Sequence, residues 1–180
     1  DDMPRILGRV LPGPPDGARR ALAARIHSGI TRRAMPSMDL VYSYAAFFVA
    51  YLVGSISFAV IISRMMGLGD PRTYGSKNPG ATNVLRSGSK LAAVLTLLLD
   101  ALKGYVPTAL VHYYAFELGF EDPTIAFVGL AAFVGHLFPV FFKFQGGKGV
   151  ATAAGVLLAY DPLLGGLTLL TWIAVAVVFR

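Results

Sequence analysis

The chain has 180 residues, of which 55% are hydrophobic and 14% are charged, and its formal net charge is +6. Its mean hydropathy of +0.61 exceeds that of an ordinary water-soluble domain, so burial in lipid is the simplest explanation. The absence of cysteine excludes a disulfide framework, a thiolate metal site and a cysteine nucleophile. The histidines lie far apart without ligand-like spacing, so we expect no bound metal.

The first part of the chain differs from the rest in composition. Residues 1–37 are rich in arginine, proline and glycine and contain no apolar segment. We interpret them as an N-terminal extension that is disordered or not native, with Met35 or Met38 as the true start. A transit peptide is the alternative, although such peptides are usually rich in serine and poor in acidic residues. Residues 38–180 form the second expected unit, a multi-spanning membrane domain.

Apolar segments dominate that second unit and predict an all-α, polytopic α-helical integral membrane protein. The first segment, 40–63, carries no formal charge and is long enough, at about 1.5 Å per residue, to cross a hydrocarbon core of about 30 Å. Segment 150–160 is too short to span, so it must tilt, end part-way across or lie within protein. About five hydrophobic segments are expected in all: 40–63, 91–116, 124–142, 150–160 and 163–179.

The basic character has a topological explanation. A pI near 9.8 would suggest nucleic-acid binding in a soluble protein, but we expect no nucleic-acid partner because cations between spans follow the positive-inside rule. The loop after the first segment and the loop around Lys148 would then be cytoplasmic, and the acidic loop around Glu121 external. A native arginine-rich start would make both ends of the first span basic and leave the orientation open.

The first basic loop, residues 74–86, combines glycines, amides, hydroxyls and cations. Such a stretch can bring backbone N–H groups close to an anion while Arg86 supplies a forked, bidentate donor. The alternative is a tight turn whose cations anchor lipid headgroups, with its asparagines capping the loop. The candidate phosphate-binding residues of this loop are Ser76, Lys77, Asn78, Gly80, Asn83 and Arg86.

The second loop, residues 144–152, is a glycine-lysine turn that opens onto an apolar helix. Helix amino termini attract anions through free N–H groups and the helix dipole, and Lys148 adds a point charge. It is not a nucleotide-binding P-loop, because Phe142 stands where the first glycine would fall and Gly149 follows the lysine. The candidate substrate-binding residues here are Gly146, Gly147, Lys148 and Gly149.

Two charged residues lie inside a hydrophobic segment. Asp100 and Lys103 are one helical turn apart, so we interpret them as an intramembrane pair that satisfies itself, although buried charges in lipid often serve function. His136, three residues before Pro139, is expected to be structural and to hold its helix near the second loop.

Several motifs together resemble one enzyme family. They are G-S-I-S at 54–57, G-S-K-N-P-G-A-T-N-V-L-R at 75–86, L-D-A-L-K-G at 99–104, G-H-L-F-P-V-F-F at 135–142 and G-G-K-G-V-A-T at 146–152. From Met38 to Arg180 the chain resembles the bacterial acyl-phosphate-dependent glycerol-3-phosphate acyltransferases, the PlsY family. Many members of that family have proline and glycine where this chain has Ser57 and Ala59.

The resemblance implies an enzyme of the bacterial inner membrane whose active site faces the cytoplasm. It would transfer a fatty acyl group from acyl phosphate to the 1-hydroxyl of glycerol 3-phosphate, giving lysophosphatidic acid and inorganic phosphate without a cofactor or metal. Ser76 and Arg86 would be catalytic, and the second loop would bind glycerol 3-phosphate. Membrane lipids are the other expected partners, and no pattern specifies an oligomeric state.

The resemblance also implies about seven spans in a complete member and a third motif, with a histidine and an asparagine, beyond Arg180. We therefore expect the C-terminal part of the acyltransferase domain to be missing from this chain. An organic-phosphate transporter or phosphate-binding membrane protein is the alternative function, because it would also need glycine-rich loops and cations at a membrane face.

Overall fold

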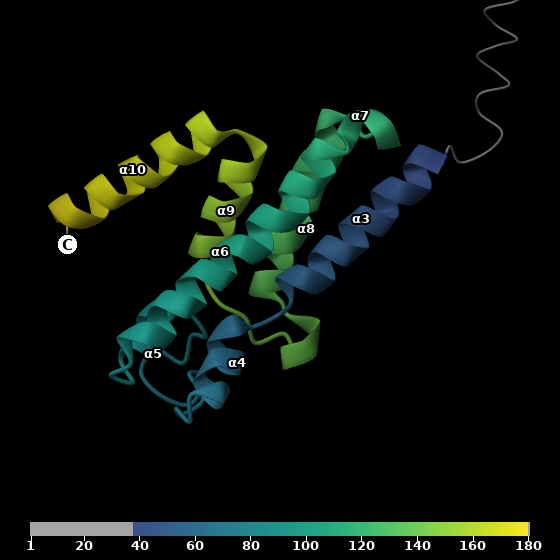
Figure 1. Ribbon diagram of the computed structural model, residues 1–180. Coiled ribbons are helices and arrows are strands. Elements are labelled where there is room, and N and C mark those ends of the chain that lie inside the picture. Colours follow the sequence, from purple (N-terminus) through teal and green to yellow (C-terminus); the bar gives the residue numbers. More distant parts are fainter. Residues whose placement is uncertain (1–37, 180) are drawn as a thin grey trace, which may run out of the picture. The chain divides into compact units, whose positions relative to one another are not determined.

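The computed structural model describes residues 38–179, and the prediction for residues 1–37 lies outside this range. The described residues form helices joined by loops, with no strand among them (Figure 1). In chain order the helices are α3 (Met38–Gly54), α4 (Phe58–Met65), α5 (Ala81–Leu85), α6 (Lys90–Tyr113), α7 (Ala115–Leu118), α8 (Asp122–Leu137), the short 3₁₀ helix η1 (Val140–Phe142), α9 (Val150–Tyr160) and α10 (Pro162–Phe179).

The length and composition of these helices confirm the predicted all-α membrane architecture. Lys90–Tyr113, Asp122–Phe142 and Pro162–Phe179 are each long and apolar enough to cross a membrane. A fourth span is obtained if α3 and α4 are counted together. The predicted segment 150–160 coincides with α9, which has 11 residues and is too short to cross alone.

The predicted first span, 40–63, is not one continuous helix. The chain leaves the helix after Gly54 and resumes at Phe58, and the axes of α3 and α4 differ by 42°. A break at membrane depth is tolerated only where protein groups satisfy the freed backbone. Ser55 Oγ donates to the Tyr51 carbonyl at 2.8 Å, and Lys103 Nζ donates to the Ile56 carbonyl at 2.6 Å. A lysine from α6 therefore stabilises the break in the first span.

Close contact between helices positions the two loops. The principal packed pairs are α6 with α9 and α3 with α8, and α8 also contacts α6 and α9. Gly104 and Gly155 allow α6 and α9 to approach closely, since a Cβ on Gly104 would collide with the Thr152 carbonyl and one on Gly155 with the Ala101 carbonyl. Small residues thus bring the start of α9 against the middle of α6.

The loops lie at one end of this bundle. Figure 1 shows α4 and α5 at one end of α6 and α7 at the other. Ser89 caps the start of α6, and its hydroxyl accepts a hydrogen bond from the Ala92 N–H at 3.2 Å. α5 packs against α6. Both glycine-containing loops therefore extend from the end of the bundle that carries α4 and α5, and the acidic loop after α7 extends from the other.

Candidate functional site

The first loop is folded around the side chain of Asn83, which is 2% exposed. Its Nδ2 donates to the Pro71 carbonyl at 2.6 Å and to the Tyr74 carbonyl at 3.1 Å. Its Oδ1 accepts from the Ser76 N–H at 3.0 Å. Because both the amide nitrogen and the amide oxygen of Asn83 are bonded to the backbone of the loop, Asn83 maintains the loop conformation. Its assignment to substrate binding stays a prediction.

The predicted catalytic residues Ser76 and Arg86 meet at that same amide. Arg86 Nη1 lies 3.5 Å from Asn83 Oδ1, beside the Ser76 N–H that bonds to the same oxygen. Gly75, with φ of +56°, lies against Arg86, since a Cβ on Gly75 would be 3.2 Å from Arg86 Nη1. Ser76 and Arg86 are both exposed. The loop therefore brings a hydroxyl and a guanidinium together at its surface, where they can contact an anion.

The remaining predicted residues of the first loop lie around this pair. Lys77 is exposed and adopts a left-handed backbone conformation with φ of +56°. Asn78 is half-buried, and its carbonyl accepts from the Gly80 N–H at 2.9 Å. Gly80 precedes α5 without a side-chain cap. Lys77 is thus placed to reach an anion, whereas Asn78 and Gly80 shape the turn into α5.

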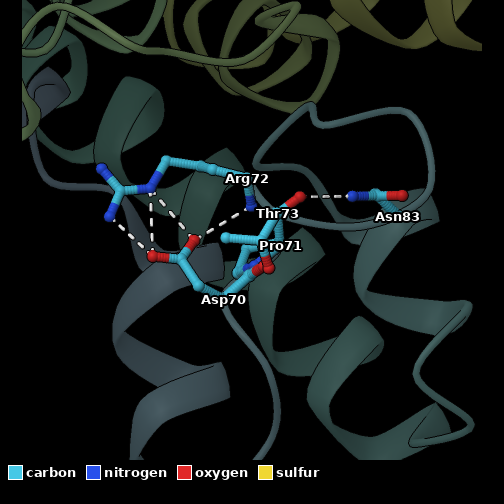
Figure 2. A network of polar contacts seen from close by, with 5 residues as sticks. All are labelled: Asp70, Pro71, Arg72, Thr73 and Asn83. Carbon is cyan, nitrogen blue, oxygen red and sulfur yellow. Dashed lines mark hydrogen bonds and ion pairs between the residues drawn. The ribbon is translucent and has the colours of Figure 1, made fainter.

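An ion pair at the start of the first loop was not singled out in the sequence. Figure 2 shows the Arg72 guanidinium folded over Asp70, with Asn83 reaching the intervening Pro71. Arg72 Nη2 lies 2.6 Å from Asp70 Oδ2, and both Arg72 Nε and the Arg72 N–H donate to Asp70 Oδ1, at 3.0 and 2.9 Å. The guanidinium carbon is also 5.8 Å from the centroid of the Phe142 ring. Arg72 therefore joins the first loop to the segment before the second.

The second loop is held by the end of α8. The Gly147 N–H donates to the His136 carbonyl at 3.2 Å, so this amide is already used within the protein. A Cβ on Gly147 would collide with His136 Nε2 and come within 3.1 Å of the Pro79 carbonyl, and one on Gly146 would collide with the His136 carbonyl. Gly147 is therefore the point at which the two loops meet.

The second loop then turns into α9. Gly149, with φ of +75°, immediately precedes Val150 and provides no side-chain cap. The first amides of α9 consequently have no hydroxyl or carboxylate acceptor at the cap position. Lys148 is exposed beside them. This arrangement, a lysine next to an uncapped helix start, is suited to an anion.

Beneath the two loops lies a buried polar cluster formed by Asp100, Lys103, His136 and Thr152. The predicted Asp100–Lys103 pair is present, with Nζ 2.9 Å from Asp100 Oδ1. That carboxylate oxygen lies outside hydrogen-bond geometry, so the contact is an ion pair. Asp100 and Lys103 are only 3% and 4% exposed, so water does not solvate their charges. Each residue therefore neutralises the charge of the other.

Thr152 joins this ion pair to His136. The Thr152 hydroxyl donates to the Asp100 carbonyl at 2.8 Å and lies 3.1 Å from His136 Nδ1. Because the single hydroxyl proton goes to a carbonyl, which can only accept, we assign the proton on the imidazole to Nδ1. The other nitrogen, Nε2, then faces Gly147 unprotonated. His136 thus connects the buried ion pair with the second loop, and its structural role stays a prediction.

A pH dependence follows from the Asp70–Arg72 pair. Hydrogen bonds from the Arg72 guanidinium hold the pKa of Asp70 below its usual range, and partial burial acts in the opposite direction. The stabilisation is complete above the unfolded-state pKa of about 4 and is lost as pH falls through the lower folded-state pKa. We expect the melting temperature of the wild-type protein to exceed that of Asp70→Asn by a constant amount down to about pH 5. The difference should shrink below about pH 4 in detergent-based thermal unfolding, and a difference that persists at about pH 2 would contradict this role.

The known proteins that are similar to this chain share one description. Residues 44–180 match the family model described as glycerol-3-phosphate acyltransferase. The glycerol-3-phosphate acyltransferase of Albidiferax ferrireducens is 62% identical over 146 residues, which cover 81% of this chain and 65% of the relative. That of Paraburkholderia phymatum is 63% identical over 128 residues, which cover 71% of this chain and 61% of the relative. The chain thus spans less than two thirds of the length of these curated relatives.

Two solved structures are similar to the described fold. Both are crystal structures of PlsY, an integral membrane glycerol 3-phosphate acyltransferase. The glycerol 3-phosphate form matches with a TM-score of 0.67 and 41% identity, covering 74% of this chain and 65% of that chain. The lysophosphatidic acid form matches with a TM-score of 0.66 and 40% identity, covering 74% and 64%. These likenesses and the apolar helices identify a multi-pass membrane protein.

Proposed function

The chain belongs to the glycerol-3-phosphate acyltransferase family, and from this membership we propose that it carries part of an acyltransferase that uses a fatty acyl phosphate. The acyl group would be transferred to the 1-hydroxyl of glycerol 3-phosphate, giving lysophosphatidic acid and inorganic phosphate. Similar structures described as a glycerol 3-phosphate form and a lysophosphatidic acid form support the acceptor and the product. The acyl phosphate donor is the part of the proposal that rests on the family resemblance alone.

The observation that carries the proposal is the meeting of two cationic loops at Gly147. The first loop presents Ser76 and Arg86 around Asn83, and the second presents Lys148 at the start of α9. A reaction between two phosphorylated substrates needs two anion sites close together, because each phosphate must be neutralised while the acyl carbon and the alcohol come into contact. One loop for each phosphate meets that requirement.

The proposed reaction forms one bond and breaks one. The alcohol oxygen of glycerol 3-phosphate attacks the acyl carbonyl, the bond between that carbon and the phosphate oxygen breaks, and the alcohol proton leaves with the phosphate. Arg86 and Lys77 would neutralise the departing phosphate, and the Ser76 hydroxyl would stabilise the developing oxyanion. An acyl phosphate is already activated, so this scheme requires no covalent intermediate.

The second loop would bind the phosphate of glycerol 3-phosphate. The N–H of Gly147 bonds to the His136 carbonyl, so the donors proposed for the phosphate are the amides that open α9, together with Lys148. Gly146 and Gly149 would contribute by letting the loop pack against α8, because a Cβ would collide with the His136 carbonyl or the Phe133 ring. The helix dipole of α9 adds partial positive charge at the same place.

We also propose that the protein lies in the bacterial inner membrane with this site facing the cytoplasm. Support comes from the charge distribution. The end of the bundle with the two loops carries the exposed cations Arg64, Lys77, Arg86, Lys90, Lys143 and Lys148. The opposite end carries the exposed acidic residues Glu117, Glu121 and Asp122. Because basic loops are usually retained on the cytoplasmic side, this distribution would orient the candidate site inward.

The test is release of inorganic phosphate from palmitoyl phosphate in the presence and absence of glycerol 3-phosphate. The purified chain would be assayed beside a version extended with the corresponding C-terminal part of the Albidiferax ferrireducens relative. We expect glycerol-3-phosphate-dependent release that Arg86→Ala lowers by about 100-fold or more and Ser76→Ala by about 10-fold or more, since both would act on charge that develops in the transition state. Arg64→Ala, which removes an exposed arginine at the end of α4, is the matched control.

Each outcome has a distinct meaning. Activity in both versions would show that these 180 residues suffice. Activity only in the extended version would show that the C-terminal segment taken from the relative supplies a required part of the site. Silence from both, with radiolabelled glycerol 3-phosphate taken up by proteoliposomes, would replace the acyltransferase with the phosphate transporter.

A further inference from the structure

We propose that Arg72 is a positioning residue that holds the first loop against the segment leading into the second loop, and so sets the separation of the two anion sites. This inference rests on the proposed function. The ligands are a phosphate monoester and an acyl phosphate bound at the same time, one by each loop. Arg72 itself would contact neither phosphate.

One side of Arg72 is fixed by Asp70. Three polar atoms of Arg72 contact that carboxylate: Nη2 lies 2.6 Å from Oδ2, and Nε and the backbone N–H lie 3.0 and 2.9 Å from Oδ1. The two side chains are 25% and 31% exposed, so the pair is only partly screened by solvent. A guanidinium held by a bidentate carboxylate has little freedom to reorient. The orientation of the Arg72 guanidinium is therefore fixed relative to the backbone of residues 70–72, just before the first loop.

The backbone beside Arg72 is bound in turn to the predicted catalytic residues. The Pro71 carbonyl accepts from Asn83 Nδ2 at 2.6 Å, and Asn83 Oδ1 accepts from the Ser76 N–H and lies 3.5 Å from Arg86 Nη1. Thr73 adds two bonds from its N–H and its hydroxyl to the Asp70 carbonyl, at 2.9 and 2.8 Å. A displacement of Arg72 would therefore be passed to Ser76 through Asn83.

The other side of Arg72 rests on Phe142, with 5.8 Å between the guanidinium carbon and the ring centroid. Phe142 ends η1, and its carbonyl accepts from the Gln145 N–H at 3.1 Å, directly before Gly146. The left-handed backbone of Lys143 and Phe144 makes this a tight turn with a fixed path. The Arg72–Phe142 contact therefore joins the two loops at a second point, separate from the contact between Gly147 and the Pro79 carbonyl.

The experiment compares Phe142→Leu with Phe141→Leu. Both remove an aromatic ring from η1, but Phe141 is 60% exposed and carries no contact with Arg72 among the interactions of the described residues. For Phe142→Leu we expect the KM for glycerol 3-phosphate to rise by about three- to ten-fold while kcat stays within about two-fold, because a cation–π contact of modest strength is lost. Phe141→Leu should leave both constants unchanged. A residue that only supported folding would lower the active fraction, and with it kcat, and leave KM alone.

A double-mutant cycle tests whether Asp70, Arg72 and Phe142 act as one unit. Asp70→Asn and Phe142→Leu should each raise KM, and the double variant should be little worse than the more affected single variant, since either change removes the same support. Arg72→Lys keeps the charge but loses the fork, so it should resemble Asp70→Asn. Independent, multiplicative effects of the two changes would overturn the proposal.

A readout without substrate separates failure of this proposal from failure of the proposed function. Trypsin cleavage after the exposed Lys77 reports the order of the first loop, and Phe142→Leu leaves every tryptic site in place. We expect cleavage there to be about three- to ten-fold faster in Phe142→Leu than in Phe141→Leu. That result with no activity in either the chain or its extended version would retain the loop contact and reject the acyltransferase. Equal cleavage of the two variants, or faster cleavage with an unchanged KM in an active enzyme, would overturn the positioning role.

Discussion

Replacing Lys103 with methionine is expected to lower the free energy of unfolding by about 3–5 kcal/mol. The substitution leaves the carboxylate of Asp100 buried without its compensating charge, after the loss of a contact of 2.9 Å. It also removes the donor to the Ile56 carbonyl at the break between α3 and α4. Methionine retains most of the side-chain volume, so the effect measures the charge. The measurement is equilibrium or thermal unfolding in detergent, followed by circular dichroism.

The control is Lys90→Met, the same substitution at the exposed first residue of the same helix, which we expect to change stability by less than about 0.5 kcal/mol. The double variant Lys103→Met with Asp100→Leu should recover much of the loss, because replacement of a buried pair by apolar side chains is often nearly neutral. If Lys103→Met unfolds at the wild-type midpoint, the ion pair does not stabilise the bundle.

Gly147→Ala is expected to lower kcat/KM for glycerol 3-phosphate by about 100-fold, the loss typical of a reactive group displaced by about 1 Å. The added Cβ would collide with the imidazole of His136 and press against the Pro79 carbonyl, so the two loops would have to separate. Neither neighbour can easily withdraw, since one is backbone and the other is held by Thr152. Steady-state kinetics of the active form, with glycerol 3-phosphate as the varied substrate, measures the effect.

Gly166→Ala is the matched control for this change. Gly166 lies in α10, and an added Cβ there would meet nothing within 4 Å. We expect that variant to keep wild-type kinetics and to match Gly147→Ala in helix content. An unchanged kcat/KM in Gly147→Ala would mean that the contact between the loops has no part in catalysis.

The hydrophobic segments could be predicted from the sequence because lipid imposes a long uncharged run on each span. α9 matched its predicted limits, and α6, α8 and α10 differed from theirs by a few residues. The break after Gly54 was missed. A proline in place of Ser57 would have indicated a break, but this chain has none there. Lys103, which stabilises the break, lies far along the chain in α6. Short-range patterns carry no signal for such a partner.

The sequence was enough to predict which residues lie at the candidate site, but it was less informative about the role of each one. Glycine, lysine and arginine in two loops predicted anion sites, and the structure brings the two loops together at Gly147. Asn83 could be read either as a ligand or as a cap, and its buried amide is committed to the loop. Asp70 and Arg72 had a detectable signal, an acidic and a basic residue two positions apart on either side of a proline. Thr152 had none, because its partners Asp100 and His136 come from other helices.

The shortness of α9 bears on how deep in the membrane the proposed substrates would meet. Its 11 residues extend about 17 Å, whereas the hydrocarbon core is about 30 Å thick. In the proposed orientation, Asp161, which is exposed and charged at the end of α9, would lie at the outer headgroups. Gly149 would then lie about 13 Å below the inner surface of the core, with α9 along the membrane normal. A water-soluble phosphate would then descend between the loops to meet the lipid at the depth of the acyl chains. The fatty substrate, conversely, would have no need to leave the bilayer for the reaction to occur.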